Sequence, residues 1–90
     1  MTKRDRIPAP KVNLNGTSAK ALTAQVVAVR EALEALDKAL AEASPHGRDY
    51  QLQPEVDLAE ARGFHAANRA YVSEMADAYG VLHIRLIDQE

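Results

Sequence analysis

The chain has 90 residues, of which 47% are hydrophobic and 27% are charged, and its formal net charge at pH 7 is -2. A chain of this length forms at most one domain and lies near the lower limit for a self-sufficient hydrophobic core. Cysteine is absent, which excludes a disulfide framework and a thiolate metal site, and no apolar run reaches the ~20 residues of a membrane span. We therefore expect a cytosolic protein that does not enter a membrane.

Residues 1-16 predict an extended or disordered basic arm. Pro8 and Pro10 fix the φ angle and lack a backbone donor, so regular structure is not expected here. Ile7, Val12 and Leu14 are apolar and can lie on another surface of the molecule. The arm carries four basic residues against one acidic residue, whereas the rest of the chain carries seven basic and twelve acidic residues. Four cations give a small electrostatic footprint, so duplex nucleic acid is not an expected partner.

A long helix is predicted over about residues 18-43. Apolar residues there alternate three and four positions apart and form a heptad seam: Ala19, Leu22, Val26, Val29, Leu33, Leu36, Leu40 and Ala43. Small side chains form a second stripe: Ala21, Ala24, Ala28, Ala32, Ala35 and Ala39. Arg30, Glu34 and Lys38 lie on a face that we expect to be exposed to solvent. Two apolar stripes indicate two neighbours for this helix.

A loop is predicted over residues 44-56, because the stretch SPHG at 44-47 interrupts the helical pattern. Gly47 is expected to adopt a left-handed conformation there. A second helix is predicted over about residues 57-88, with Asp57 and Glu60 as a capping-box-like pair at its start.

The second helix continues the seam with Leu58, Ala61, His65, Asn68, Val72, Met75, Tyr79, Leu82 and Leu86. Gly63 and Gly80 each weaken a helix by about 1 kcal/mol relative to alanine, so a kink or a stop at Gly80 is an alternative. In that alternative residues 81-87 form a strand. We favour the helix, because a single strand would have no partner in this chain.

These elements predict an all-α fold, in which residues 17-90 form an antiparallel helical hairpin domain behind the arm. Two helices of this length can bury only one stripe each against the other. A long apolar strip left in water normally marks an interface. We therefore expect the hairpins to assemble into a homo-oligomeric helical bundle.

Two loops contain candidate recognition residues. In NLNGTS, residues 13-18, Thr17 or Ser18 can cap the first helix, and Lys20 lies within its first turn. A lysine there opposes the helix dipole, but together with Asn15 and Thr17 it suits a bound phosphate. The alternative is an ordinary cap with a solvated lysine.

In HGRDYQ, residues 46-51, three side chains suit a nucleotide. Arg48 can bind a phosphate, Tyr50 can stack on a base, and Asp49 can accept from a hydroxyl or an amine. The structural alternative is that Arg48 and Asp49 pair with helix ends while Tyr50 covers the core.

A third polar group, His65, Asn68 and Arg69, lies on the second helix. Polar residues in a seam usually fix register through a hydrogen bond, although His65 and Arg69 also suit a ligand. The histidines have no partner at the spacing of a metal site, and no nucleophile, phosphate loop or catalytic triad is evident. We therefore expect neither a metal, nor a cofactor, nor enzymatic activity.

The combination of NLNGTS, GRDY and the histidine-arginine patch resembles a group of short phage and prophage proteins, from about Val12 to Tyr79. The chain departs from that pattern at Gln51 and Phe64. The resemblance implies a helical fold and a phage origin, and hence a place in the host bacterial cytoplasm.

A similar case is the phage sponge proteins, which sequester cyclic nucleotide or cyclic ADP-ribose signals of immune systems such as CBASS and Thoeris. By this analogy the partners are a small phosphorylated nucleotide and further copies of the chain. The expected ligand-binding residues are Asn15, Thr17, Lys20, Arg48, Asp49, Tyr50, His65 and Arg69. The alternative is a non-catalytic interaction or structural protein that docks on a host or phage protein.

Overall fold

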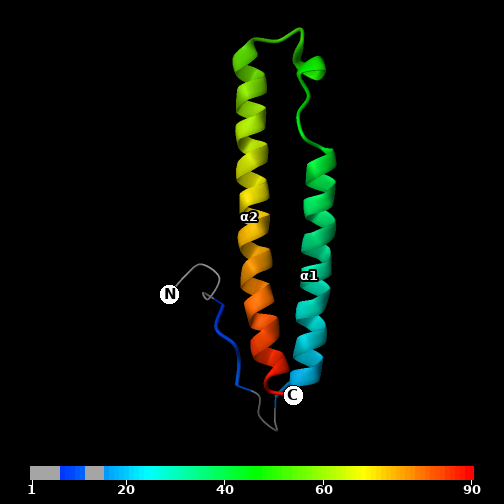
Figure 1. Ribbon diagram of the computed structural model, residues 1–90, viewed down its shortest axis with the longest axis vertical. Coiled ribbons are helices and arrows are strands. Elements are labelled where there is room, and N and C mark those ends of the chain that lie inside the picture. Colours follow the sequence, from blue (N-terminus) through cyan, green and yellow to red (C-terminus); the bar gives the residue numbers. More distant parts are fainter. Residues whose placement is uncertain (1–6, 12–15) are drawn as a thin grey trace.

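Two long antiparallel α-helices form the body of the molecule (Figure 1). The computed structural model describes residues 7-11 and 16-90. Helix α1 spans Ala19–Glu42 and helix α2 spans Glu55–Ile87, and a short 3-10 helix, η2, spans Gly47–Tyr50 between them. The described residues contain no strand. The predicted all-α helical hairpin is therefore confirmed.

Helix α1 begins and ends within one residue of its predicted bounds. At its start the Ser18 Oγ accepts a hydrogen bond from the Ala21 backbone N–H at 3.1 Å, which confirms the predicted cap by Thr17 or Ser18. At its end the Ala43 N–H donates to the carbonyls of both Ala39 and Leu40. These bonds satisfy backbone groups that the helix ends would otherwise leave unpaired.

Helix α2 begins two residues earlier than predicted. Pro54 is its N-cap residue, and the Pro54 carbonyl accepts from the Asp57 N–H at 3.0 Å. The predicted capping pair of Asp57 and Glu60 is therefore wrong, because Asp57 already lies inside the first turn. Its carboxylate instead accepts from the Gln53 side-chain amide at 3.1 Å. Proline has no backbone N–H to donate within a helix, so α2 begins directly after Pro54.

The two glycine predictions have different outcomes. Gly47 does not have a positive φ, so the predicted left-handed conformation is wrong. The residue opens η2, and a 3-10 helix has right-handed backbone angles with negative φ. Gly80 lies within α2, which runs unbroken to Ile87. The favoured helix over residues 81-87 is thus confirmed and the strand alternative is wrong.

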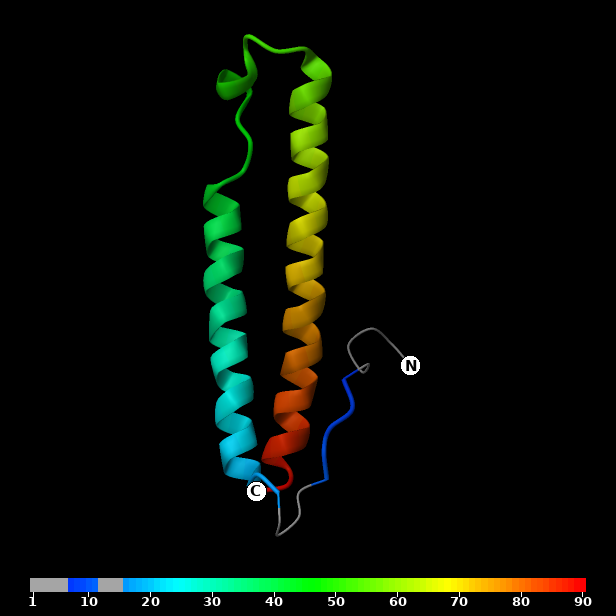
Figure 2. The same cartoon turned by 180° about the vertical axis from the view of Figure 1, so that it is seen from behind.

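The core lies along the seam between α1 and α2, which remain side by side in every view (Figure 2). Its buried side chains are all apolar: Ala19, Val26, Leu33, Val72, Ala78, Leu82 and Leu86. All but Ala78 belong to the two predicted seams. Asn68, predicted as a seam residue, is exposed, whereas the adjacent Arg69 is half-buried. The stripe of six alanines on α1 is entirely exposed, so in the described part of the chain α2 is the one helix that packs on α1.

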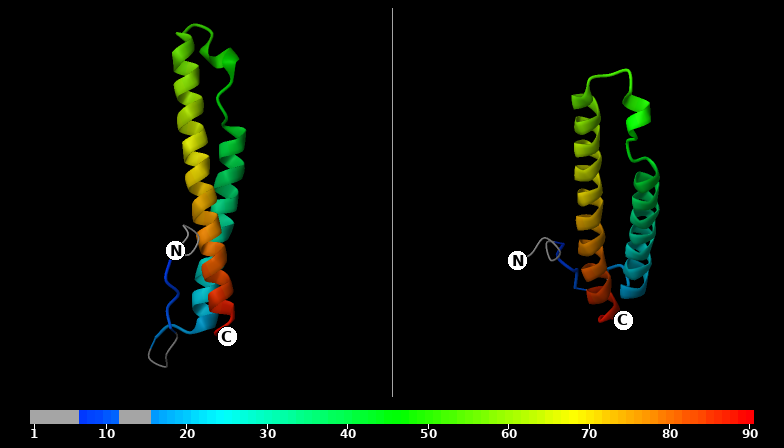
Figure 3. Two further views of the ribbon diagram at one scale, coloured as in Figure 1. Left: turned by 60° about the vertical axis from the view of Figure 1, so that its left-hand side comes forward. Right: turned by 45° about the horizontal axis from the view of Figure 1, so that its top comes forward.

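The described part of the arm, residues 7-11, lies beside the C-terminal half of α2 (Figure 3). Ile7 and Ala9 pack against the core cluster of Val26, Leu82 and Leu86, so the expectation that Ile7 covers another surface is confirmed. The Gln89 side-chain amide donates to the Pro10 carbonyl at 2.8 Å. These contacts connect the two ends of the chain. Val12 and Leu14, with the other residues of 1-6 and 12-15, lie outside the described residues.

The molecule is a rod rather than a sphere, with principal extents of 62 × 25 × 17 Å. Its radius of gyration is 18.3 Å, whereas a compact domain of this length has one of about 12 Å. Large apolar side chains remain exposed on it, and Phe64 and Tyr71 retain 74% and 64% of their accessible surface. This thin core motivates the expectation of an oligomer, which stays a prediction.

Because Leu86 is 1% exposed and belongs to the main core cluster, Leu86→Ala should lower the free energy of unfolding by about 2 to 5 kcal/mol. Leu52→Ala is the matched control, since Leu52 is fully exposed and its truncation should change stability by less than about 0.5 kcal/mol. Urea unfolding followed by circular dichroism at a fixed protein concentration measures both. Equal effects of the two variants would contradict the core assignment.

Ser18→Ala should destabilise the chain by about 1 kcal/mol, because it removes the acceptor for the Ala21 N–H. Thr17→Ala tests the neighbouring hydroxyl and should have no effect on stability if Ser18 is the cap. The same urea titration compares the two variants. A larger loss from Thr17→Ala than from Ser18→Ala would reject the cap assignment.

Candidate functional site

The residues predicted to bind a ligand lie in three places along the rod. Thr17 and Lys20 are at the N-terminal end of α1, whereas Arg48 and its neighbours in η2 are at the opposite end of the hairpin (Figure 1). His65 and Arg69 lie on α2 between these ends. Asn15 lies outside the described residues. One chain therefore does not bring its two candidate loops together, as expected from the order of the elements.

The N-terminal end of α1 presents positive charge. Lys20 is exposed in the first turn, and that turn contains no acidic residue. The helix dipole adds partial positive charge at the same end. Thr17, which precedes the N-cap residue Ser18, is also exposed to solvent. This end can attract an anion, although a cation in that position does not itself stabilise the helix.

The opposite end combines charged and aromatic groups around η2. Arg48 and Asp49 are exposed, and Tyr50 is half-buried. Tyr50 lines a shallow hollow of about 480 Å³, together with Gly47, Gln51, Gln53, Glu55, Leu58, Ala59 and Arg62. Arg62 was not among the residues predicted from the sequence. Its spacing of three residues from Ala59 places both residues on the same side of α2, which faces the loop, and this spacing could have identified it.

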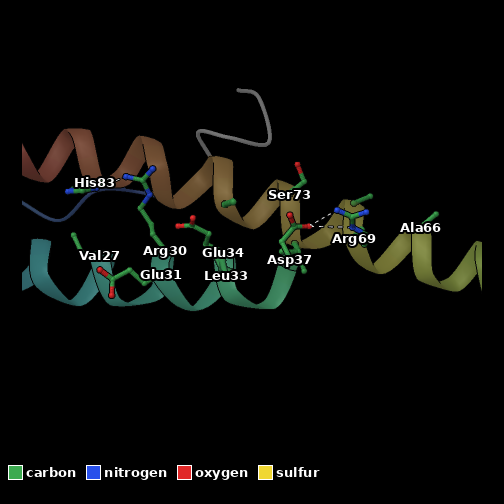
Figure 4. A pocket seen from close by; sticks show the side chains of 13 residues that line it. Val27, Arg30, Glu31, Leu33, Glu34, Asp37, Ala66, Arg69, Ser73 and His83 are labelled. Carbon is green, nitrogen blue, oxygen red and sulfur yellow. Dashed lines mark hydrogen bonds and ion pairs between the residues drawn. The ribbon is translucent and has the colours of Figure 1, made fainter. Parts of the chain in front are cut away.

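A larger groove of about 880 Å³ runs along one side of the seam between the helices (Figure 4). Helix α1 contributes Arg30, Glu31, Glu34 and Asp37 to it, and the small side chains of Ala66, Ala70, Ser73 and Ala76 from α2 leave it open. Of the predicted ligand residues in the described chain, Arg69 lines this groove. Since both signs of charge are present, the groove does not form a uniformly basic anion site.

Polar contacts join α1 and the segment that follows it to α2. The Arg69 guanidinium donates to the Asp37 carboxylate at 3.2 Å, and Ser44 and His65 form a hydrogen bond of 3.2 Å. Nearer the chain ends, Arg30 and His83 form one of 2.7 Å. Residues 30 and 37 of α1 and residue 44, just after its end, are seven positions apart and so lie at equivalent positions beside the heptad seam. The contact of His65 with Ser44 is of the kind expected of a register-fixing residue.

Arg30 corrects part of the sequence analysis. It was assigned to a face exposed to solvent with Glu34 and Lys38, and its residue surface is indeed exposed. Its guanidinium nevertheless reaches across to α2 and hydrogen-bonds to His83. Arg30 lies seven residues before Asp37, and this heptad spacing indicates that both residues are on the same side of α1. The spacing does not identify His83 as the partner of Arg30, because the register of the two helices is set only in the folded hairpin.

Within residues 7-11 and 16-90, no group of three or more histidines and carboxylates is arranged to hold a metal ion. In the same ranges no helix combines the length and the apolar character that crossing a membrane requires. Comparisons of the chain with protein-family models, curated proteins and solved structures gave no match.

The ion pair of Asp37 and Arg69 should contribute little to stability, because the two side chains are 51% and 42% exposed. A double-mutant cycle with Asp37→Asn and Arg69→Gln should give a coupling energy below about 1 kcal/mol that decreases as salt is added. Urea unfolding in low and high salt provides the measurement. A salt-independent coupling of several kcal/mol would show that the pair is desolvated in solution, contrary to its exposure.

Proposed function

We propose that this chain is a phage-encoded anti-defence protein that sequesters a small nucleotide-derived immune signal without catalysis. The signal is of the cyclic oligonucleotide or cyclic ADP-ribose type, and the protein acts in the host bacterial cytoplasm. The ligand lies in pockets between subunits. The observation that carries this proposal is the presence of exposed cationic groups at both ends of the hairpin, with an aromatic ring at one of them.

The distance between these two groups supports a pocket shared by two chains. Helix α1 has 24 residues and is thus about 36 Å long. A cyclic dinucleotide is far shorter, so it cannot contact Lys20 and Arg48 of the same chain. An antiparallel neighbour would place its own Lys20 beside Arg48 and Tyr50 of the first chain. Such a pocket would combine a helix N-terminus with a phosphate-binding arginine and a ring for stacking.

The middle of α2 has a secondary place in the proposal. His65 and Arg69 are both half-buried and already contact α1 through Ser44 and Asp37. A ligand that used either side chain would have to replace that contact. The primary binding residues are therefore Lys20, Arg48 and Tyr50, together with Thr17, Asp49 and, from the sequence prediction, Asn15.

The second candidate function is a non-catalytic interaction protein that docks on a host or phage protein. The exposed apolar side chains of Phe64 and Tyr71 favour it, because aromatic residues in water commonly mark protein interfaces. Both functions are compatible with self-association. They differ in the residues that matter, since docking depends on the helix faces and sequestration on the helix ends.

Titration calorimetry with cyclic dinucleotides, cyclic trinucleotides and cyclic ADP-ribose tests the proposed function. We expect at least one of these ligands to bind, and Arg48→Ala or Tyr50→Ala to weaken that binding roughly tenfold or more. Lys38→Ala is the matched control, because it removes an exposed cation from α1 away from both loops. Absence of binding across the panel would count against sequestration.

Two further measurements separate the candidate functions. Light scattering should give a mass that is a multiple of the 9.8 kDa chain, and Arg48→Ala should retain it. A pulldown from infected cells, analysed for small molecules and for proteins, should recover a nucleotide under the sequestration proposal. Under the docking alternative, Leu36→Asn abolishes recovery of a protein partner whereas Arg48→Ala does not. A stable monomer at micromolar concentration would exclude the shared pocket.

A further inference from the structure

The contact between Arg30 and His83 has a defined direction. Arginine carries only N–H donors, so in the 2.7 Å hydrogen bond the Arg30 Nη1 donates and the His83 Nδ1 accepts. An imidazole nitrogen accepts only when it carries no proton. The contact therefore requires neutral His83 with its single proton on Nε2, and a second proton on Nδ1 removes the acceptor.

The Arg30 guanidinium also lies against the backbone of α2. A Cβ placed on Gly80 would be 3.8 Å from the Arg30 Nη2 and 4.0 Å from its Cζ, which are distances of ordinary van der Waals contact. Gly80 is one turn from His83, so the arginine packs on α2 beside the residue to which it hydrogen-bonds.

The hydrogen bond at the other end of the hairpin has the opposite requirement. The Ser44 hydroxyl donates its only hydrogen to the Ala41 carbonyl at 2.9 Å. In the contact of 3.2 Å with the His65 Nε2, the Ser44 Oγ must therefore accept. The His65 Nε2 carries a proton in one neutral form and also in the cation. Protonation of His65 thus preserves its contact, whereas protonation of His83 abolishes the contact with Arg30.

We propose that Arg30 and His83 form a proton-sensitive latch that holds the C-terminal part of α2 on α1 and opens in mild acid. When His83 gains a proton, the hydrogen bond is lost and two cations lie side by side (Figure 4). The latch lies in the hairpin half that also contains the buried Leu82 and the packed arm. Opening it loosens that half while the contact of Ser44 and His65 persists. This proposal is independent of the proposed nucleotide ligand.

Charged side chains from both helices line the groove that contains His83. Helix α1 contributes Arg30, Glu31, Glu34 and Asp37, and α2 contributes Arg69. The described arm contains one charged residue, Lys11, which is exposed. Histidine is the side-chain type whose ordinary charge change falls between about pH 5 and 8. Because a second ring proton on His83 removes the acceptor for Arg30, acid favours opening.

The first test is nitrogen-15 NMR of the histidine rings in the full chain, which distinguishes the two neutral forms and the cation. At pH 7.5 we expect the His83 proton on Nε2. As the pH falls to 5.5, we expect Nδ1 to gain a proton and to stop accepting the hydrogen bond from Arg30. His83 with its proton on Nδ1 at pH 7.5 would overturn the proposal. This measurement needs no variant, so it decides the point even where a substitution prevents folding.

The second test compares urea unfolding at pH 7.5 and pH 5.5. Acidification should lower the folding equilibrium constant of the unmodified chain roughly two- to tenfold more than that of His83→Gln, whose amide oxygen accepts from Arg30 at either pH. His65→Gln is the matched control and should respond to acid as the unmodified chain does. An equal response of the unmodified chain and His83→Gln would reject the latch, as would an acid response that only His65→Gln removes.

Discussion

The whole molecule depends on a single apolar seam between two helices. Each helix can bury one stripe against the other, and within residues 7-11 and 16-90 no third element is long enough to cover the remaining faces. The buried side chains therefore form one row along the rod, and the alanine stripe of α1 is left in water. A chain with so thin a core gains stability readily from another copy of itself, which is why the proposed function includes self-association.

The seam determines which atoms meet but does not by itself prevent one helix from sliding along the other. The polar contacts at its edge provide that specificity. Asp37 with Arg69, and Ser44 with His65, are only partly buried, so each contributes little energy. Several such contacts at heptad spacing nevertheless disfavour a shifted register, since any shift separates all of them at once. Stability therefore comes from the apolar row and alignment from its polar edge.

The division between the sides and the ends of the rod also separates structural from functional candidates. Along the sides, polar side chains cross between α1 and α2 and are occupied by structural contacts. At the ends, Lys20 and Arg48 are exposed, and Tyr50 lines an open hollow. A rod that places its recognition groups at both ends acquires a complete pocket when a neighbour lies antiparallel to it. The proposed sequestration and the proposed oligomer are thus two consequences of one geometry.

The sequence by itself determined the two long helices of this fold, but not the short helix η2 in the predicted loop. Heptad spacing identified both helices and nearly all of the core, and Ser18 was among the expected caps, because these features depend on local periodicity and local hydrogen bonds. The predicted backbone of Gly47 and the predicted start of α2 were wrong, because the residues there can adopt more than one backbone conformation.

The tertiary structure alone decided which polar residues face each other. The sequence placed Asn68 in the seam and Arg30 on the solvent face, whereas the folded hairpin exposes Asn68 and connects Arg30 to His83. The physical reason is that facing partners depend on the rotation and register of two packed helices. Successive residues of a helix differ by about 100° around its axis, so a small rotation of one helix exchanges one facing residue for the next. The rotation of each helix is fixed only when the seam packs.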